Sequence, residues 1–264
     1  GLEGAGRVRA VGDGVTGFAV GDRVAWSDGP GSYAELVATP AARAVPVPEG
    51  ISDEVAVGAL LQGMTAHALV TDVRPVQAGE DLLVTAAAGG VGLLLTQLAA
   101  ARGARVIATV STAEKEELAR AAGAAEVIRY TEVDDLAGVV RELTGGTGVA
   151  AAFDSVGRTT FDASLASLRR LGMLVLYGAA SGPVPPFDPQ RLNAGGSLFL
   201  TRPKLGDYVV TREDLLVRAA AVFGAVADKT LDVRIGHRYP LAEARAAHED
   251  LQARRTTGKL LLIP

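Results

Sequence analysis

The sequence contains no cysteine, which excludes disulfide bonds and thiolate metal ligands. Histidine is also scarce, and His67, His237 and His248 follow neither an H-E-x-x-H pattern nor another spacing typical of metal ligands. No G-x-S-x-G sequence is present, so the nucleophile elbow of a hydrolase is absent as well. We therefore predict no metal site, and the sequence assigns no catalytic acid, base or nucleophile.

Long apolar runs and clusters of basic residues are absent too. No segment reaches the roughly 18 apolar residues of a membrane span, and we find no secretory signal. The 26 basic and 30 acidic residues give a net charge of −4, which argues against nucleic acids and anionic membranes as partners. Hydrophobic residues make up 48% of the chain and aromatic residues 5%, with 32 glycines, as is typical of a buried α/β core. We expect a soluble, cytoplasmic protein.

The first part of the chain, to about residue 62, consists of short extended segments separated by glycine and proline. Its β-like segments are "GRVRAV", "GDRVAW", "GSYAELVATP" and "AARAVPVPEG", which predict a β-rich module. A helix is then predicted within "ISDEVAVGALLQGMTAHALV", with Ser52 as its N-cap and Glu54 in its first turn. The chain opens without an initiator methionine, in what reads as a strand already under way. We therefore expect that an N-terminal portion precedes it.

From Leu82 onward, apolar strands alternate with helices, a pattern that predicts βαβ crossovers and a parallel sheet buried on both faces. The predicted strands are 82–86, 105–110, 126–130, 149–154 and 173–177, with "GSLFLTRP" as a sixth. The predicted helices between them are 91–102, 113–122, 133–143 and 159–170. A long helix near 211–227, a strand near 231–236, a short helix near 241–253 and the segment "GKLLLIP" complete the chain.

The turn after the first of these strands reads "AAAGGVG". A dinucleotide-binding turn usually reads G-x-G-x-x-G, and here Ala87 replaces the first glycine while Gly89 and Gly92 are kept. Gly89 lets the backbone approach a pyrophosphate at the helix N-terminus, and Gly92 lets the helix pack against the strand. A tight turn without a ligand is the alternative. The residues that we expect to bind the cofactor here are Ala88, Gly89, Gly90, Val91 and Gly92.

The end of the second strand decides which dinucleotide the turn favours. An NAD site usually places an acidic residue there to bind the ribose 2′-hydroxyl. This chain instead has Ser111 and Thr112, followed by Lys115 one helical turn later. Hydroxyl groups and an ammonium suit a 2′-phosphate. The alternative for Lys115 is a solvated surface lysine, but a cation is poorly placed at a helix N-terminus. The sequence therefore predicts NADPH as the cofactor.

Two further segments, "FDSVG" at 153–157 and "LYGAASG" at 176–182, end the fourth and fifth strands. Ligands of open parallel sheets lie beyond the carboxyl ends of the strands. We therefore expect these segments, with Ser155 and Val156 in the first, to line the cofactor. The alternative is that Gly157 and Gly178 are only turn residues.

Several segments carry a resemblance to a known family. They are "GLEGAGRV", "GDRV", "AAAGGVG", "TAEK", "FDSVG", "SLFLTRP", "YPLAEARAAHE" and "TTGKLLLIP". In order and content, the chain resembles the zinc-independent medium-chain dehydrogenases/reductases of the NADPH:quinone oxidoreductase (zeta-crystallin-like) family. Zinc alcohol dehydrogenases of the same superfamily carry a metal-binding histidine where this chain has Leu2.

The resemblance implies two domains. One is a Rossmann-type NADPH-binding domain with a doubly wound parallel sheet, at 63–203. The other is a partial GroES-like β-barrel, the catalytic domain, at 1–62 and 204–264, with about fifty N-terminal residues of that domain absent. Without that segment, part of the nicotinamide pocket would be missing.

The resemblance also implies roles for individual residues. Lys115 and Tyr130 would hold the adenosine 2′-phosphate, and Arg254 would reach the same end of the cofactor. The residues expected to border the cofactor elsewhere are Met64, Thr65, Tyr177, Gly178 and Ala179. The implied partner in assembly is a second copy of the chain, paired through 197–201.

The expected activity is metal-free hydride transfer from NADPH to a quinone or a similar electron-poor alkene or carbonyl compound. Two alternatives stay open at this point. One is an enoyl-thioester reductase of the same superfamily, and the other is an NADPH-binding protein with little turnover.

Overall fold

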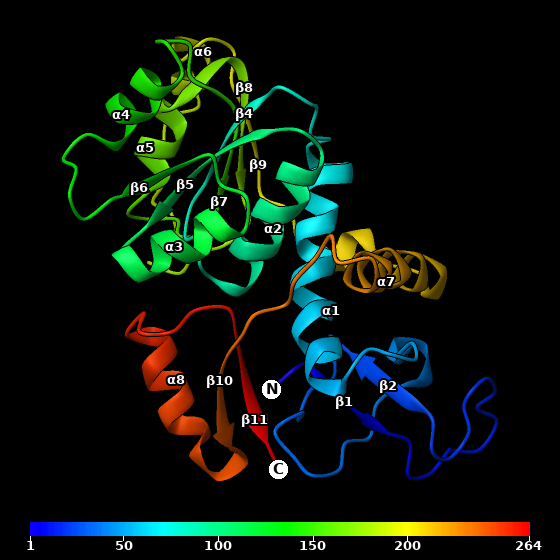
Figure 1. Ribbon diagram of the computed structural model, residues 1–264. Coiled ribbons are helices and arrows are strands. Elements are labelled where there is room, and N and C mark those ends of the chain that lie inside the picture. Colours follow the sequence, from blue (N-terminus) through cyan, green and yellow to red (C-terminus); the bar gives the residue numbers. More distant parts are fainter. The chain divides into compact units, whose positions relative to one another are not determined.

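The computed structural model describes all residues, Gly1–Pro264. They form two compact units: Gly1–Thr65 with Leu205–Pro264, and Ala66–Lys204 (Figure 1). The boundaries expected from the sequence, after residues 62 and 203, lie within a few residues of these. No helix is both long and apolar enough to cross a lipid bilayer.

The second unit is built on a six-stranded parallel sheet with the order β6-β5-β4-β7-β8-β9. The strands are β4 (Asp81–Val84), β5 (Arg105–Val110), β6 (Glu126–Arg129), β7 (Val149–Asp154), β8 (Leu168–Leu176) and β9 (Phe199–Thr201). The chain winds outward from β4 in one direction and from β7 in the other, so the topological switch point lies between these two strands. The predicted doubly wound sheet is confirmed.

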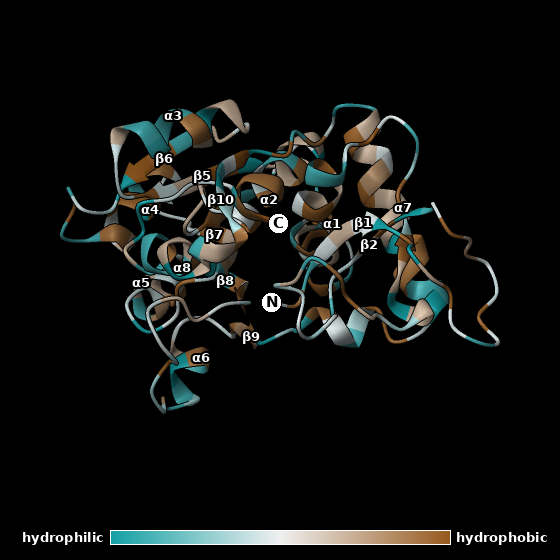
Figure 2. Ribbon diagram, turned by 90° about the horizontal axis from the view of Figure 1, so that it is seen from below, coloured by the Kyte–Doolittle hydropathy of each residue, from teal (hydrophilic) through white to brown (hydrophobic).

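The helices of this unit connect successive strands. They are α2 (Gly90–Ala101), α3 (Ala113–Ala121), α4 (Leu136–Leu143), α5 (Phe161–Ala166) and α6 (Gln190–Ala194), preceded by a π-helical turn at Leu69–Val73. α2 buries most of its residues and is mostly hydrophobic, whereas α3 buries only Ala119 and has a hydrophilic face (Figure 2). Every residue of β7 is buried, as expected for a central strand covered on both faces.

One predicted helix of this unit is too long. The interval 159–170 continues a helical spacing of apolar residues through Phe161, Leu165 and Leu168, but α5 ends at Ala166. Leu168 instead opens β8 and pairs with Val149. Because that pairing joins residues far apart in the sequence, periodicity alone could not reveal it. The helix predicted at 133–143 begins later, at Leu136, where the Asp135 side chain caps it by accepting from Gly138 N–H at 2.9 Å.

The first unit contains two small sheets. β1 (Gly4–Arg7), β2 (Arg23–Trp26) and β3 (Val45–Pro46) are antiparallel, while β10 (Ile235–Pro240) and β11 (Lys259–Ile263) form a parallel pair. The helices are α1 (Asp53–Ala68), α7 (Arg212–Ala227) and α8 (Ala244–Gln252), with 3₁₀ turns at Ala41–Arg43, Leu205–Tyr208 and Leu241–Glu243. Within this chain the five strands do not close into a barrel.

Two strand predictions in this unit are wrong, two are correct only in part, and one helix start is confirmed. Of "GRVRAV" only the first two residues belong to a strand, and "AARAVPVPEG" is strand only at Val45–Pro46. The interval 31–40 forms bends instead of a strand, and the strand expected at 231–236 lies at Ile235–Pro240. In the first case the β-like residues have no neighbouring strand with which to pair. Ser52 caps α1 as predicted, because its hydroxyl accepts from Val55 N–H at 3.2 Å.

Candidate functional site

The turn between β4 and α2 lies at the carboxyl edge of the sheet, next to the switch point. Ala86 adopts the left-handed conformation (φ 50°), and Gly89 N–H donates to its carbonyl at 3.0 Å. Ala87, at the position of the missing first glycine, is fully buried and donates its N–H to Thr109 at 3.2 Å. The substitution is therefore compatible with a tight turn, because the left-handed conformation falls on Ala86 and not on Ala87.

The start of α2 is packed closely against this turn. A Cβ atom on Gly92 would lie 2.4 Å from the Ala86 carbonyl oxygen, so no side chain fits there. Gly89 is the N-cap, and the first helical hydrogen bond runs from Leu93 N–H to Gly89 at 3.0 Å. The preceding N–H groups of Gly90, Val91 and Gly92 have no partner within the helix. Such a helix start favours a phosphate group.

The residues expected at a 2′-phosphate lie together at the end of β5. Thr112 is the N-cap of α3 and accepts from Lys115 N–H at 3.3 Å, while the Lys115 ammonium donates to Ser111 Oγ at 3.4 Å. Tyr130, just after β6, donates its N–H to Val110 at 3.0 Å and is exposed.

The acidic groups near this cluster either form ion pairs or are exposed to solvent. Glu116, in the first turn of α3, forms ion pairs with Arg120 (2.9 Å) and Arg129 (3.2 Å). Glu114 is exposed in the same turn. The cluster of Ser111, Thr112 and Lys115 therefore presents two hydroxyls and a cation, which are donors for an anion.

The loops after β7 and β8 are joined by backbone hydrogen bonds. Tyr177 N–H donates to Asp154 O at 2.8 Å, Ala180 N–H to Ser155 O at 3.1 Å and Ser181 N–H to Val156 O at 2.8 Å. A Cβ on Gly178 would lie 2.3 Å from Ser155 O, and Gly157 has a left-handed φ of 86°. Both glycines are therefore required by close backbone approach or by conformation.

Tyr177 places a buried hydroxyl in this region, and no partner lies within good hydrogen-bond geometry of it, although the Ser155 side chain is nearby. Burial raises the pKa of the Tyr177 phenol, the interaction with Ser155 lowers it and the charge of Asp154 raises it; the net change is upward, so the group stays neutral. A buried hydroxyl without a partner costs free energy that a polar ligand can recover. The edge therefore fits a ligand with polar groups.

Three predicted residues belong to the first unit. Met64 and Thr65 are on α1, where Met64 is fully buried and the Thr65 hydroxyl donates to Leu61 O at 2.8 Å. Arg254 follows α8, is exposed and has a left-handed φ of 58°. The structure thus gathers the turn, the 2′-phosphate cluster and the loops after β7 and β8 at one edge of the second unit.

Sequence reasoning missed two residues at the switch point. Thr85 and Asp154 are fully buried at the carboxyl ends of β4 and β7, and the Thr85 hydroxyl donates to the Asp154 carboxylate at 3.3 Å. The only signal in the sequence is a carboxylate at the end of an otherwise apolar strand, "VAAAFD".

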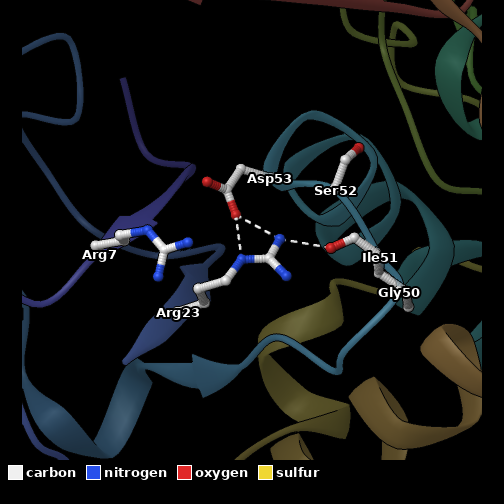
Figure 3. Close-up of a pocket in the computed structure, with 6 residues that line it drawn as sticks. All are labelled: Arg7, Arg23, Gly50, Ile51, Ser52 and Asp53. Carbon is white, nitrogen blue, oxygen red and sulfur yellow. Dashed lines mark hydrogen bonds and ion pairs between the residues drawn. The ribbon is translucent and has the colours of Figure 1, made fainter. Parts of the chain in front are cut away.

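A shallow pocket in the first unit is lined by Arg7, Arg23 and the segment 50–53 (Figure 3). The Arg23 guanidinium donates to Asp53 Oδ1 at 2.6 and 2.9 Å and to Ile51 O at 2.5 Å. Its donors are therefore used to attach β2 to the start of α1, and we assign no ligand to this pocket.

No three His, Asp or Glu side chains lie close enough together to hold a metal ion. Leu2 is 54% exposed, and its side chain offers no ligand atom. The residues present therefore do not fit a zinc site.

Comparison with known proteins gives the family. The sequence models of the zinc-binding dehydrogenases and of the alcohol dehydrogenase GroES-like domain match residues 90–215 and 1–49. A quinone oxidoreductase of Pseudomonas aeruginosa is 44% identical over 100% of this chain and 81% of its own length. The chain belongs to the quinone oxidoreductase family.

Two further relatives point to a substrate class and to a cofactor. A 2-haloacrylate reductase of a Burkholderia species is 41% identical over 100% of this chain and 80% of its own length. A mycobacterial protein solved in complex with NADPH is 54% identical, with a TM-score of 0.96 over 100% of this chain and 82% of that one. The family model that matches residues 90–215 is described as that of a zinc-binding dehydrogenase, while residues 1–264 hold no group of three His, Asp or Glu side chains that could bind a metal ion.

Proposed function

We propose that this protein is an NADPH-dependent oxidoreductase that reduces quinones or similarly electron-poor alkenes and carbonyl compounds without a metal. The single observation that carries the proposal is the carboxyl edge of the sheet, where a glycine turn at a helix N-terminus lies beside the cluster of Ser111, Thr112 and Lys115, at a strand end that carries no acidic residue. Relatives named quinone oxidoreductase and 2-haloacrylate reductase support both substrate classes. NADPH supplies a hydride when it is bound.

Within this site each segment of the chain has a distinct task. The N–H groups of Gly90, Val91 and Gly92 bind the pyrophosphate at the start of α2, and the backbone of Ala88 and Gly89 borders it. Ser111, Thr112, Lys115 and Tyr130 hold the 2′-phosphate. The loop residues that border the rest of the cofactor are Ser155, Val156, Tyr177, Gly178 and Ala179. The Rossmann unit is thus the NADPH-binding domain.

The other unit is the catalytic domain in this proposal. Thr65 contacts the nicotinamide end of the cofactor and Arg254 the phosphate end. We assign no proton donor. A quinone that accepts a hydride becomes a stabilised phenolate-like anion, so the hydride transfer needs no metal. Positioning the two reactants is then the main task of the chain.

The test is steady-state oxidation of NADPH by the purified full-length protein with 1,4-benzoquinone, an enone and a crotonyl thioester as separate acceptors. We expect turnover with the quinone or the enone, unchanged after dialysis against a chelator. Turnover with the thioester alone would favour an enoyl-thioester reductase. NADPH binding without turnover on any acceptor would leave a binding protein and refute the proposed activity.

We also propose a homodimer paired through residues 197–201. β9 is one of the two outermost strands of the sheet and Phe199 is 53% exposed, so this strand offers an apolar side to a second copy of the chain. Proline at 199 removes an N–H donor and clashes with a neighbouring strand. Light scattering should therefore give a dimer for the unmodified protein and a monomer for Phe199→Pro. A monomeric unmodified protein at micromolar concentration would refute the pairing. A cytoplasmic location stays a prediction.

A further inference from the structure

The Asp154 carboxylate at the end of β7 is fully buried and forms no ion pair. Its oxygens accept hydrogen bonds from neutral groups only. The donors are Thr85 Oγ1 (3.3 Å), Val156 N–H (2.8 Å), Gly157 N–H (3.0 Å), Thr160 Oγ1 (2.8 and 2.7 Å to the two oxygens) and Ser164 Oγ (2.7 Å). A buried carboxylate is tolerated only when it is hydrogen-bonded in this way.

These donors come from the segments that form the cofactor site. Thr85 immediately precedes the turn after β4, and its hydroxyl also accepts from Ser155 N–H at 3.1 Å. Val156 and Gly157 form the loop after β7. The Asp154 carbonyl accepts from Tyr177 N–H at 2.8 Å and Gly178 N–H at 3.3 Å, in the loop after β8. One residue thus joins the carboxyl ends of three neighbouring strands, β4, β7 and β8.

The other two donors come from the start of α5. Thr160 precedes this helix and Ser164 lies in it, so the carboxylate also fixes where the helix begins. The donors surround both oxygens, and a change to an amide would replace one acceptor by a donor group. The loop 155–157 would then lose part of the hydrogen bonding that determines its conformation.

We propose that Asp154 is the positioning residue of the cofactor site. Its carboxylate fixes loop 155–157 and, through Thr85, the position of that loop relative to the glycine turn, so that both segments are preformed for NADPH. This inference rests on the proposed NADPH site. It predicts that removing the carboxylate weakens NADPH binding beyond what a general loss of stability would cause.

Two serines provide a matched pair for the test. Ser164 and Ser167 are both fully buried, three residues apart, and each loses one hydroxyl on change to alanine. Ser164 donates to Asp154, whereas Ser167 donates to Ala163 O at 2.7 Å and does not touch the carboxylate. NADPH affinity by fluorescence titration and the urea midpoint are measured for Asp154→Asn, Ser164→Ala and Ser167→Ala.

For Asp154→Asn we expect the Kd for NADPH to rise about ten- to a hundredfold, as when a supporting hydrogen-bond partner of a binding group is lost. Ser164→Ala should raise it about threefold or more, while Ser167→Ala should lower the urea midpoint without changing the Kd. In steady state, Asp154→Asn should raise the KM for NADPH and leave the KM for the quinone unchanged.

An unchanged Kd in both Asp154→Asn and Ser164→Ala, with midpoints shifted as in Ser167→Ala, would overturn the inference. If Asp154→Asn does not fold, Thr85→Val gives the second test, because it removes the hydroxyl that joins the Asp154 carboxylate to Ser155 N–H. An unchanged Kd in Thr85→Val and Ser164→Ala then has the same meaning. Failure of the unmodified protein to bind NADPH would instead refute the proposed function, so the two failures are distinguishable.

Discussion

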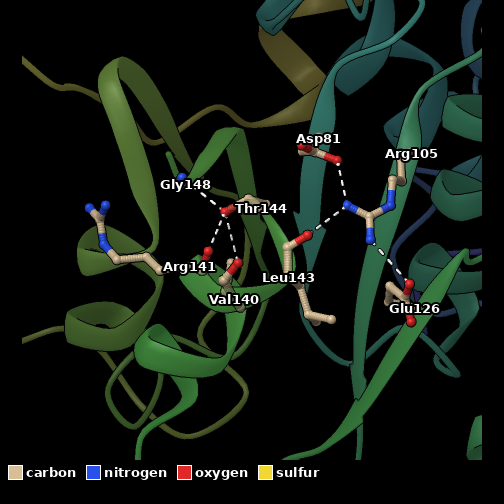
Figure 4. A network of polar contacts seen from close by, with 8 residues as sticks. All are labelled: Asp81, Arg105, Glu126, Val140, Arg141, Leu143, Thr144 and Gly148. Carbon is tan, nitrogen blue, oxygen red and sulfur yellow. Dashed lines mark hydrogen bonds and ion pairs between the residues drawn. The ribbon is translucent and has the colours of Figure 1, made fainter. Parts of the chain in front are cut away.

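The amino-terminal ends of the parallel strands (the amino edge) and their carboxyl-terminal ends (the carboxyl edge) are held together by different kinds of contact. At the amino edge, Arg105 donates to Asp81 and Glu126, each at 3.1 Å, and to Leu143 O at 2.9 Å (Figure 4). These bonds connect the starts of β4, β5 and β6 with the end of α4. A second cluster at this edge pairs Glu80 with Arg74 and Arg169.

At the carboxyl edge the contacts are short, buried and made by uncharged donors around Asp154, and two glycines replace side chains where the loops approach each other. Long charged side chains reach across strands and tolerate solvent, but their geometry is loosely fixed. Buried bonds to backbone N–H groups fix a loop conformation and leave the space above it open. The comparison supports our proposal that the carboxyl edge serves binding, and it assigns the amino edge to stability.

The largest effect is expected from a methyl group at the carboxyl edge. Gly178→Ala would place a Cβ 2.3 Å from Ser155 O, so the two loops must separate. We expect a loss of about 1–3 kcal/mol in the free energy of unfolding and no measurable NADPH binding. Gly224→Ala is the control, because its Cβ would meet open space on α7; it should keep full binding. Normal NADPH affinity in Gly178→Ala would refute the close packing of the loops.

The second-largest effect is expected in cofactor preference, at the cluster of Ser111, Thr112 and Lys115. Lys115→Ala should remove most of the preference for NADPH over NADH, about 1–3 kcal/mol for a charge-assisted contact, while the affinity for NADH changes little. Lys115→Arg keeps the charge and should keep most of the preference. Fluorescence titration with both cofactors measures this. If Lys115→Ala keeps the same preference for NADPH over NADH, Lys115 does not bind the 2′-phosphate.

At the amino edge we expect a smaller effect, and we expect it on stability and not on NADPH binding. Arg105→Met removes three hydrogen bonds, but the Arg105 side chain is 37% exposed, so we expect a loss of about 1–2 kcal/mol in the free energy of unfolding. NADPH affinity should not change. Arg245→Met, which breaks an ion pair on a 91% exposed side chain, should cost less than about 0.5 kcal/mol. A raised Kd for NADPH in Arg105→Met would contradict the division of tasks between the edges.

The smallest effect depends on pH. Burial raises the pKa of the Glu80 carboxyl, but hydrogen bonds from Arg74 and Gln77 N–H and the charges of Arg74 and Arg169 lower it by more, so the pKa lies below 4.5. The stabilisation is therefore complete above the pKa of the unfolded chain and is lost as the pH falls through the folded value. Urea unfolding should show Glu80→Gln less stable by about 1 kcal/mol at pH 7, with the difference shrinking below pH 4.5. A constant difference from pH 7 to 3 would refute this ion pair as its origin.

The sequence predicted the sheet better than the site. Five predicted strands fell on or near β4 to β8 because each is an apolar run between turn residues, and β9 followed from "SLFLT". The end of α5 and the bends at 31–40 were missed because they depend on strand pairing between distant residues. Ser111, Thr112 and Lys115 could be grouped because they are neighbours in the chain. Thr85 and Asp154 could not, since their burial and mutual contact exist only in the folded sheet.

The most direct test of the account is a fluorescence titration of the unmodified protein with NADPH and with NADH under the same conditions. Because the end of β5 offers two hydroxyls and an ammonium and no carboxylate to the ribose, NADPH should bind about tenfold or more tightly than NADH. Equal affinities, or tighter binding of NADH, would contradict the assignment of the carboxyl edge as an NADPH site.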